Sequence, residues 1–487
     1  MRKIETRSLA ALAMVLAALV GISSCATNPV SGYPQLMLLS EEDERALGGK
    51  TDKQVVGQYG IYDNPPLTAY VGDVCMQMGR LSHRPGLSYE FRILDTPVVN
   101  AFAVPGGYVY FTRGIVAALS SEAEMAGIMG HELGHITARH SAEQYSRAQL
   151  AQVGLGLGMM LGGPIGRSLG GLAELGVGML FLSFSRENER EADRLGVEYS
   201  SRAGYDAGEM ARFFETLERM QPKADNSGLP SWFSTHPSPD DREEAVRRDA
   251  AAWQRRLNLS RLKVARNAYL KRIDGLIYGE NPREGFVEAN VFYHPDLRFR
   301  FPVPKGWKIQ NTRTLVRMVS ENKEAAILFN LSRETSPEQA AGTFVEKSKV
   351  TVLESDPKIV GGLPAYAVTS GIRTRQGGIQ ILSYFILYEG RVYEFHGLSS
   401  PDKFADYLPS FKKTMARFRP LTDPKRLNVK PDRIRIRSAG VTGSLEAALR
   451  KQGIKGKGLE KAAILNGMHL DDPVRPDTLI KVVEKGR

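Results

Sequence analysis

Cysteine is almost absent from this chain of 487 residues, which contains only Cys25 and Cys75. Two cysteines allow at most one disulfide, so a disulfide framework cannot hold the protein together. Cys75 lies among Val71, Val74, Met76 and Met78, so we expect it to be a small buried core residue. Stability must therefore come from apolar packing, for which a hydrophobic content of 42% is ordinary.

An apolar run long enough to cross a bilayer is also missing near the N-terminus. Such a span needs about 20 residues, and the run at residues 9–20 is shorter. It follows three basic residues and leads through small residues to Cys25, which is typical of a signal peptide (1–24) with a lipobox. Cys25 is then expected to carry lipid. Ala26 after it resembles the outer-membrane sorting pattern of bacterial lipoproteins.

A second apolar stretch, residues 150–184, is rich in glycine and is interrupted by Gly163 and Pro164. Each half has about 15 residues and would be roughly 22 Å long as a helix, less than the ~30 Å hydrocarbon core of a bilayer. We therefore expect a helical hairpin packed on the protein, with apolar surface that could contact membrane or an unfolded client. A transmembrane hairpin is the alternative.

The most informative motif is His131-Glu132-Leu133-Gly134-His135, an H-E-x-x-H sequence within a helical pattern. Ser121 and Glu124 fit a capping box at the start of this helix. Residues four apart lie about 40° from eclipsed around the helix axis, so both imidazoles can reach one zinc ion. Glu132 can then act as a general base towards water. Without further context, two unrelated histidines on a surface helix would give the same motif.

A catalytic zinc ion needs a third protein ligand, and residues 185–193 provide candidates. Glu189 and Asp193 are four residues apart, which places both carboxylates on one helical face. Glu189 would bind zinc, and Asp193 would accept the outer N–H of a ligand histidine. Spacing alone leaves Glu187 and Glu191 open as ligands, and a solvated charged helix is the alternative interpretation.

Four segments in this order resemble the zinc metalloendopeptidase family of the CAAX prenyl proteases and HtpX. They are residues 100–107, 131–135, 185–193 and 235–242. Within that family, the similarity is to bacterial envelope lipoproteins and periplasmic proteases of the BepA and LoiP type. The resemblance covers about residues 26–275.

This resemblance implies a gluzincin fold that holds one Zn²⁺ per subunit. The zinc ligands would be His131, His135 and Glu189, with Glu132 catalytic and Asp193 in support. His236 and Arg242 would contribute to the site, as a fourth ligand or as stabilisers of an oxyanion. The implied substrate-binding edge is a strand that pairs with an extended peptide, and it consists of Asn100, Ala101, Phe102 and Ala103.

We expect an α+β protein with three folded parts after a Pro- and Gly-containing tether at 25–40. A mostly α-helical peptidase domain with a small edge sheet spans 41–279. A small α+β domain, 284–420, resembles PsbP and Mog1 and contains no titratable cluster, which is typical of a binding or spacing module. A basic C-terminal module, 428–487, resembles LysM. It departs from that pattern at residues 442–444, where an Asp-Thr pair is expected, so glycan binding stays open.

The positive charge of the chain is concentrated near its C-terminus. Residues 411–487 contain 19 Lys and Arg against 8 Asp and Glu, an excess of 11 that equals the net charge of the whole chain. In an exported protein, such a patch favours anionic peptidoglycan or lipopolysaccharide as partner and not nucleic acid.

These features predict a zinc-dependent endopeptidase of the cell envelope, held through lipidated Cys25 at the outer membrane and facing the periplasm. Its expected substrates are misfolded or misassembled envelope proteins, so the role would be proteolytic quality control. Two other functions stay open. One is a chaperone-like holdase for outer-membrane proteins with little proteolysis, and the other is a cell-wall-binding scaffold.

Overall fold

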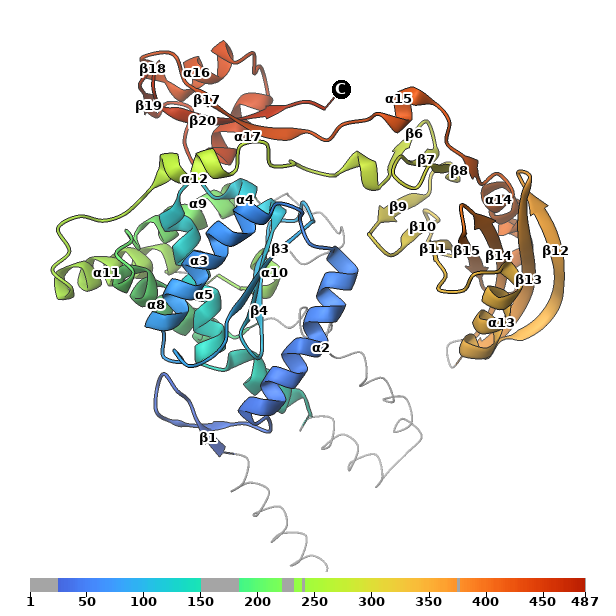
Figure 1. Cartoon of the computed structure of the whole chain (residues 1–487), viewed down its shortest axis with the longest axis horizontal. Coiled ribbons are helices and arrows are strands. Elements are labelled where there is room, and N and C mark those ends of the chain that lie inside the picture. Colours follow the sequence, from blue (N-terminus) through green and yellow to red (C-terminus); the bar gives the residue numbers. More distant parts are fainter. Residues whose placement is uncertain (1–24, 150–183, 221–231, 239–240, 375–376, 487) are drawn as a thin grey trace, which may run out of the picture.

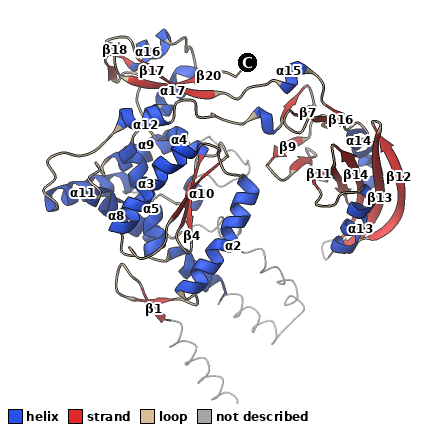
Figure 2. Cartoon of the chain, in the orientation of Figure 1, coloured by secondary structure: helices blue, strands red, loops and turns tan. Residues whose placement is uncertain are grey.

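The computed structural model describes residues 25–149, 184–220, 232–238, 241–374 and 377–486. The predicted signal peptide and nearly all of the apolar stretch 150–184 lie outside these ranges. Among the described residues, no helix is long and apolar enough to cross a membrane. Helices dominate the first part of the chain and strands the second, as Figure 1 and Figure 2 show, which confirms the mixed α+β class.

The first part is a group of helices around a small sheet. Its helices are α2 (Glu41–Tyr59), α3 (Pro65–Leu81), α4 (Arg113–Ala118), α5 (Glu122–Thr137), α8 (Arg186–Arg202), α9 (Glu209–Met220), α10 (Trp232–Thr235), α11 (Arg242–Arg256) and α12 (Arg266–Arg272). The sheet has the order β3-β5-β4, formed by β3 (Glu90–Leu94), β4 (Ala101–Val104) and β5 (Tyr108–Thr112). Strand β5 runs parallel to β3 and antiparallel to β4, which leaves β4 at an edge.

Helix α5 forms the centre of this part, and all 16 of its residues are buried. Ser121 begins it as predicted, because its hydroxyl accepts a hydrogen bond from the backbone N–H of Glu124 at 3.0 Å. The second half of the predicted capping box is wrong. The Glu124 carboxylate accepts from the backbone N–H of Ser120 at 2.5 Å and not from that of Ser121.

Glycines allow α5 and α8 to approach each other closely. A Cβ atom at Gly130 would lie only 2.9 Å from both the Cα and the carbonyl oxygen of Gly196, and one at Gly134 would lie 3.1 Å from the Cα of Ala192. Any side chain at these positions would separate the helices. The glycines at this contact therefore determine how near the acidic residues of α8 come to the histidines of α5.

The second part of the chain is built on a seven-stranded antiparallel sheet. Its order is β12-β13-β14-β15-β11-β10-β9, with β9 (Lys308–Asn311), β10 (Val316–Val319), β11 (Ala325–Leu331), β12 (Thr351–Val360), β13 (Leu363–Thr374), β14 (Gly377–Tyr388) and β15 (Arg391–Ser399). A four-stranded sheet of β6 (Phe286–Glu288), β7 (Val291–His294), β8 (Phe299–Pro302) and β16 (Arg419–Pro420) lies beside it. Sequence patterns did not reveal β12, because it is exposed along nearly its whole length.

Two helices cover opposite faces of the large sheet. Helix α13 (Pro337–Ser348) packs through Ala340 and Ala341 against Phe385. Helix α14 (Phe404–Met415) packs through Phe411 into the larger aromatic core around Phe301.

The C-terminal part has the order strand, helix, helix, strand. Its main elements are β17 (Arg433–Ser438), α16 (Leu445–Lys451), α17 (Gly458–Leu465) and β20 (Leu479–Glu484), with β17 and β20 paired antiparallel. Figure 1 shows that the chain returns from the second part to place these elements beside α12. This order does not by itself establish a LysM fold.

The C-terminal part is joined to the first part by buried contacts. The fully buried ammonium of Lys481 donates hydrogen bonds to the carbonyls of Ala117, Ala118 and Leu119, at 3.0, 3.0 and 2.8 Å, where α4 ends. Leu465 belongs to the same apolar core as α5. The two parts therefore form one packed unit.

Within residues 25–40, which we expected to be a tether, residues 25–36 form a short hairpin on the first part. Strands β1 (Cys25–Thr27) and β2 (Pro34–Leu36) pair antiparallel. Asn28 donates to the carbonyl of Ala138 at 3.4 Å, and the Leu38 N–H donates to the hydroxyl of Ser146 at 2.9 Å. These contacts hold the segment near the end of α5.

The glycine contact between α5 and α8 leads to a prediction about stability. Gly130→Ala should lower the free energy of unfolding by about 1–3 kcal/mol, since its Cβ would overlap backbone atoms of α8. Gly57→Ala in α2 is the matched control. No atom lies within 4 Å of the added Cβ, so this substitution should raise the free energy of unfolding by about 0.5–1 kcal/mol. Chemical denaturation of both variants measures the difference, and equal stability would contradict the proposed close contact.

Candidate metal centre

The two histidines of the H-E-x-x-H motif point their ring nitrogens into one buried cluster. His131 and His135 lie one turn apart on α5, and their Nε2 atoms are 3.1 Å apart. Both side chains are almost completely buried, and burial lowers the pKa of each imidazole below its usual value. The rings are therefore neutral near pH 7, which is the form that binds a metal ion.

Glu189 supplies the carboxylate of the cluster. Its Oε1 lies 3.4 Å from His135 Nε2, and its Oε2 lies 3.6 Å from His131 Nε2. Burial opposes its ionisation, but the neighbouring imidazoles outweigh burial and hold the pKa of Glu189 well below its usual value. Glu187 is exposed, and Glu191 contacts a different histidine, His140. Of the three acidic candidates, the structure therefore places Glu189 in the cluster.

Asp193 and Arg242 surround the cluster. Asp193 Oδ1 accepts a hydrogen bond from His131 Nδ1 at 2.8 Å, which fixes the tautomer that leaves Nε2 free. Arg242 donates from Nη2 to Asp193 at 2.7 Å and to Glu189 at 3.3 Å, and its guanidinium lies 3.9 Å above the ring of Phe214. Only Nη2 of this arginine is paired with the two carboxylates of α8, where its charge balances theirs, while Nε and Nη1 have no hydrogen-bond partner among the described residues.

His236, the residue that follows α10, also reaches the cluster. Its Nδ1 lies 3.0 Å from Glu189 Oε1 and 3.3 Å from His131 Nε2. The ring of Trp232 stacks on it at a centroid distance of 4.2 Å. Four residues, His131, His135, Glu189 and His236, therefore bring ligand atoms within 4.8 Å of one another, and all four are buried.

Glu132 is the remaining member of the motif, and both of its carboxylate oxygens are buried without a hydrogen-bond partner among the described residues. Burial raises the pKa of this carboxyl to about 7. The nearest cationic candidate is His236 Nε2, at 3.6 Å from Oε1. A buried carboxyl without a partner is costly unless a ligand completes its surroundings.

These observations fit a bound metal ion. The donor set of two or three imidazoles and one carboxylate is the chemistry that zinc prefers, and the unpartnered Glu132 lies beside it. The residues predicted as metal ligands from the sequence are thus brought together, and His236 joins them.

The predicted substrate edge coincides with β4. Asn100 precedes the strand, and Ala101, Phe102 and Ala103 are its first three residues. The backbone N–H of Trp232 donates to the carbonyl of Val99 at 3.2 Å, which ties α10 to the start of this edge. The segment that carries His236 is therefore tied to the residues just before β4.

Sequence reasoning missed two residues that touch the cluster. His140 Nδ1 lies 2.9 Å from His135 Nδ1, and the ring of Phe184 stacks on His135 at a centroid distance of 4.0 Å. Helical spacing could not indicate His140, because α5 ends at Thr137 and the chain turns at Arg139, where φ is 60°. Phe184 is the last residue of the apolar stretch 150–184, and no motif around it indicates a contact with the histidines.

Comparison with known proteins agrees with this arrangement. A helix with H-E-x-x-H beside a helix with a glutamate ligand defines the metallopeptidase class, and residues 65–250 match the model of peptidase family M48. This part of the chain therefore belongs to family M48.

Two similar proteins illustrate the relationship. The beta-barrel assembly-enhancing protease of Escherichia coli (strain K12) is 30% identical over 228 residues, which cover 45% of this chain and 46% of that protein. The mitochondrial metalloendopeptidase OMA1 of Schizosaccharomyces pombe is 31% identical over 216 residues, 43% of this chain and 62% of that protein. The matched segment spans about half the length of the beta-barrel assembly-enhancing proteases.

Among solved structures, cyanobacterial PsbP from Synechocystis sp. PCC 6803 matches 28% of this chain and 94% of its own length, with 11% identity and a TM-score of 0.24. The Saccharomyces cerevisiae Ran-binding protein Mog1p matches 26% of this chain with 11% identity and a TM-score of 0.20. These values are too low to support an argument about fold or function.

Proposed function

We propose that this protein is a zinc-dependent endopeptidase. The observation that carries the proposal is the buried Glu132 carboxyl, which has no hydrogen-bond partner among the described residues and lies beside a converging set of imidazole and carboxylate groups. His131, His135 and Glu189 would hold one Zn²⁺. Zinc would supply a Lewis acid that polarises the scissile carbonyl and makes water a stronger nucleophile near neutral pH.

The side chains around the metal position have distinct tasks in this proposal. Glu132 takes the proton of the attacking water and returns it to the leaving amine, and a pKa of about 7 suits a group that must do both. Asp193 orients His131, and Arg242 balances the charge of Asp193 and Glu189. The edge of β4 would align an extended peptide by backbone pairing.

The proposed substrates are misfolded or misassembled proteins of the cell envelope. Extended, unpaired segments can add to an edge strand, whereas folded proteins offer few of them. Several similar proteins are named beta-barrel assembly-enhancing proteases, which supports an envelope role. The basic residues of the C-terminal part would favour peptidoglycan or lipopolysaccharide as a further partner.

The peptidase proposal predicts different outcomes for the base and for a ligand. Glu132→Gln should retain zinc and lose peptide hydrolysis by several orders of magnitude, because only the base is removed. Glu189→Ala should lose zinc as well. Metal analysis and cleavage of casein or an unfolded porin measure both effects. Full activity in Glu132→Gln would contradict the proposal, and protection of the porin from aggregation without cleavage by the wild type would favour the holdase.

His236 is proposed to restrain the enzyme by occupying the remaining metal position until a client displaces it. Its ring already lies among the ligands and is stacked on Trp232. His236→Ala should then raise basal cleavage and self-cleavage at unchanged zinc content. The double variant with Glu132→Gln is the control and should abolish the self-cleavage. A fall in turnover with zinc retained would instead assign His236 to stabilisation of the oxyanion.

We also propose that Cys25 anchors the protein to the outer membrane through lipid. The N-terminal pattern supports this, since small residues precede Cys25 after a short apolar run. Cys25→Ser should leave an unprocessed precursor that no longer fractionates with the outer membrane, because acylation would provide the main anchor. Unchanged fractionation would assign membrane contact to the apolar stretch 150–184.

A further inference from the structure

His135 has a second contact that the proposed mechanism does not use. Its Nε2 faces the cluster, 3.4 Å from Glu189, while its Nδ1 lies 2.9 Å from Nδ1 of His140. His140 is 2% exposed, and its own Nε2 lies 3.1 Å from Oε2 of Glu191. A continuous series of contacts therefore runs from the metal ligand to a carboxylate on α8.

The hydrogens in this series can be assigned by chemistry. A neutral imidazole carries one N–H, and a metal ligand must keep the coordinating nitrogen free. Because His135 Nε2 faces the other ligands, its Nδ1 carries the hydrogen and donates to His140 Nδ1. His140 then carries its hydrogen on Nε2 and donates to Glu191. Each contact has one donor and one acceptor.

The chain holds His140 in place by a turn after α5. Arg139 adopts φ of 60°, and its guanidinium donates to Glu44 at 2.5 Å and to the carbonyl of Leu39 at 2.9 Å. This turn brings His140 back beside His135, although five residues separate them. Glu191 is two residues beyond Glu189, so α8 contributes both a ligand and the end of the series.

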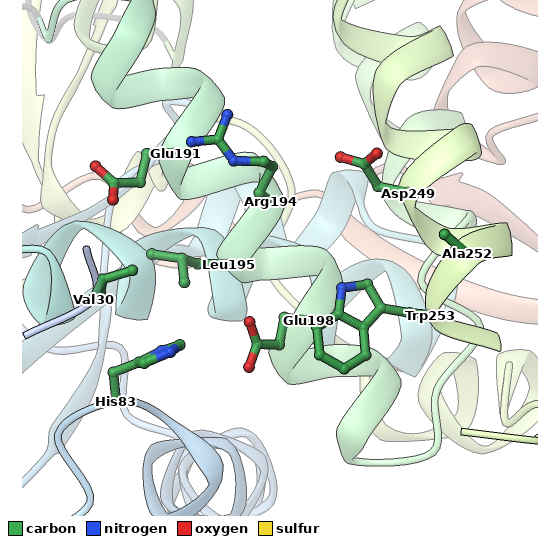
Figure 3. Close-up of a pocket in the computed structure, with 9 residues that line it drawn as sticks. All are labelled: Val30, His83, Glu191, Arg194, Leu195, Glu198, Asp249, Ala252 and Trp253. Carbon is green, nitrogen blue, oxygen red and sulfur yellow. The ribbon is translucent and has the colours of Figure 1, made fainter. Parts of the chain in front are cut away.

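The two ligand histidines thus differ in how their outer nitrogens are held. His131 donates directly to Asp193, which is buried against Arg242. The series from His135 ends at Glu191, whose side chain is 22% exposed. Glu191 lines an open pocket of about 430 Å³, with Arg194, Leu195 and Glu198 on the same helix (Figure 3).

We propose that His140 and Glu191 are positioning residues that fix the tautomer and orientation of His135 and strengthen it as a metal ligand. The proposal rests on the zinc-dependent function proposed above. Outer partners of metal-binding histidines typically contribute 10- to 100-fold to metal affinity. A second histidine between ligand and carboxylate would transmit the same effect over a longer distance.

The test is zinc affinity of the full chain, measured by competition with a chelator. His140→Leu should weaken zinc binding about 10- to 100-fold, since His135 Nδ1 loses its acceptor. His140→Asn keeps an oxygen near the position of Nδ1 and should recover most of the affinity. Glu191→Ala should weaken binding about 10-fold, and Glu191→Gln, which retains an acceptor, should weaken it less.

Glu198→Gln is the matched control, because Glu198 lies on the same helix and in the same pocket but pairs with Arg202. It should leave zinc affinity unchanged. Thermal unfolding of metal-stripped protein shows whether each variant folds. If His140→Leu does not fold, the partly exposed Glu191 variants decide the question.

The outcomes separate the two proposals. Wild-type protein that binds no zinc and cleaves no peptide would overturn the proposed function. Wild-type protein that binds zinc and cleaves, together with Glu191→Ala at wild-type zinc affinity, would overturn only the positioning role. Equal losses in Glu191→Ala and Glu198→Gln would also overturn it, because the effect would then be one of pocket charge.

Discussion

The close contact between α5 and α8 is the constraint on which the site depends. Gly130 and Gly196 let the two backbones approach until an added Cβ would lie 2.9 Å from the opposite chain. At that separation, Glu189 reaches His131 and His135, and Asp193 reaches the outer nitrogen of His131. The proposed metal ligands of the H-E-x-x-H motif and Glu189 come from two helices, so their geometry depends on the contact between those helices.

Burial of charged groups at the site carries a desolvation penalty in free energy. The cluster buries carboxylates, imidazoles and the guanidinium of Arg242 together. Pairing of Arg242 with Asp193 and Glu189 reduces the desolvation penalty, while Glu132 keeps an unpartnered carboxyl within the described structure. A bound cation would offset that penalty, so metal binding and stability should be coupled.

The C-terminal part is not an independent module, because it packs against the first part of the chain. Lys481 caps the end of α4 from inside, and Leu465 shares the core that surrounds α5. Part of the positive charge that distinguishes this region is therefore structural and is unavailable to an anionic partner. The helices of the peptidase domain and the final strands fold against each other across more than 350 residues of chain.

Sequence alone determined what helical spacing can encode. His131, Glu132 and His135 follow from an i, i+4 motif behind the cap at Ser121, and the acidic face of α8 follows from Glu189 and Asp193. Spacing alone left Glu191 open beside Glu189, and the distances that bring Glu189 and His236 to the cluster, like the place of His140, were decided by tertiary structure. These depend on the separation of two helices and on a left-handed turn at Arg139, and no local periodicity specifies either.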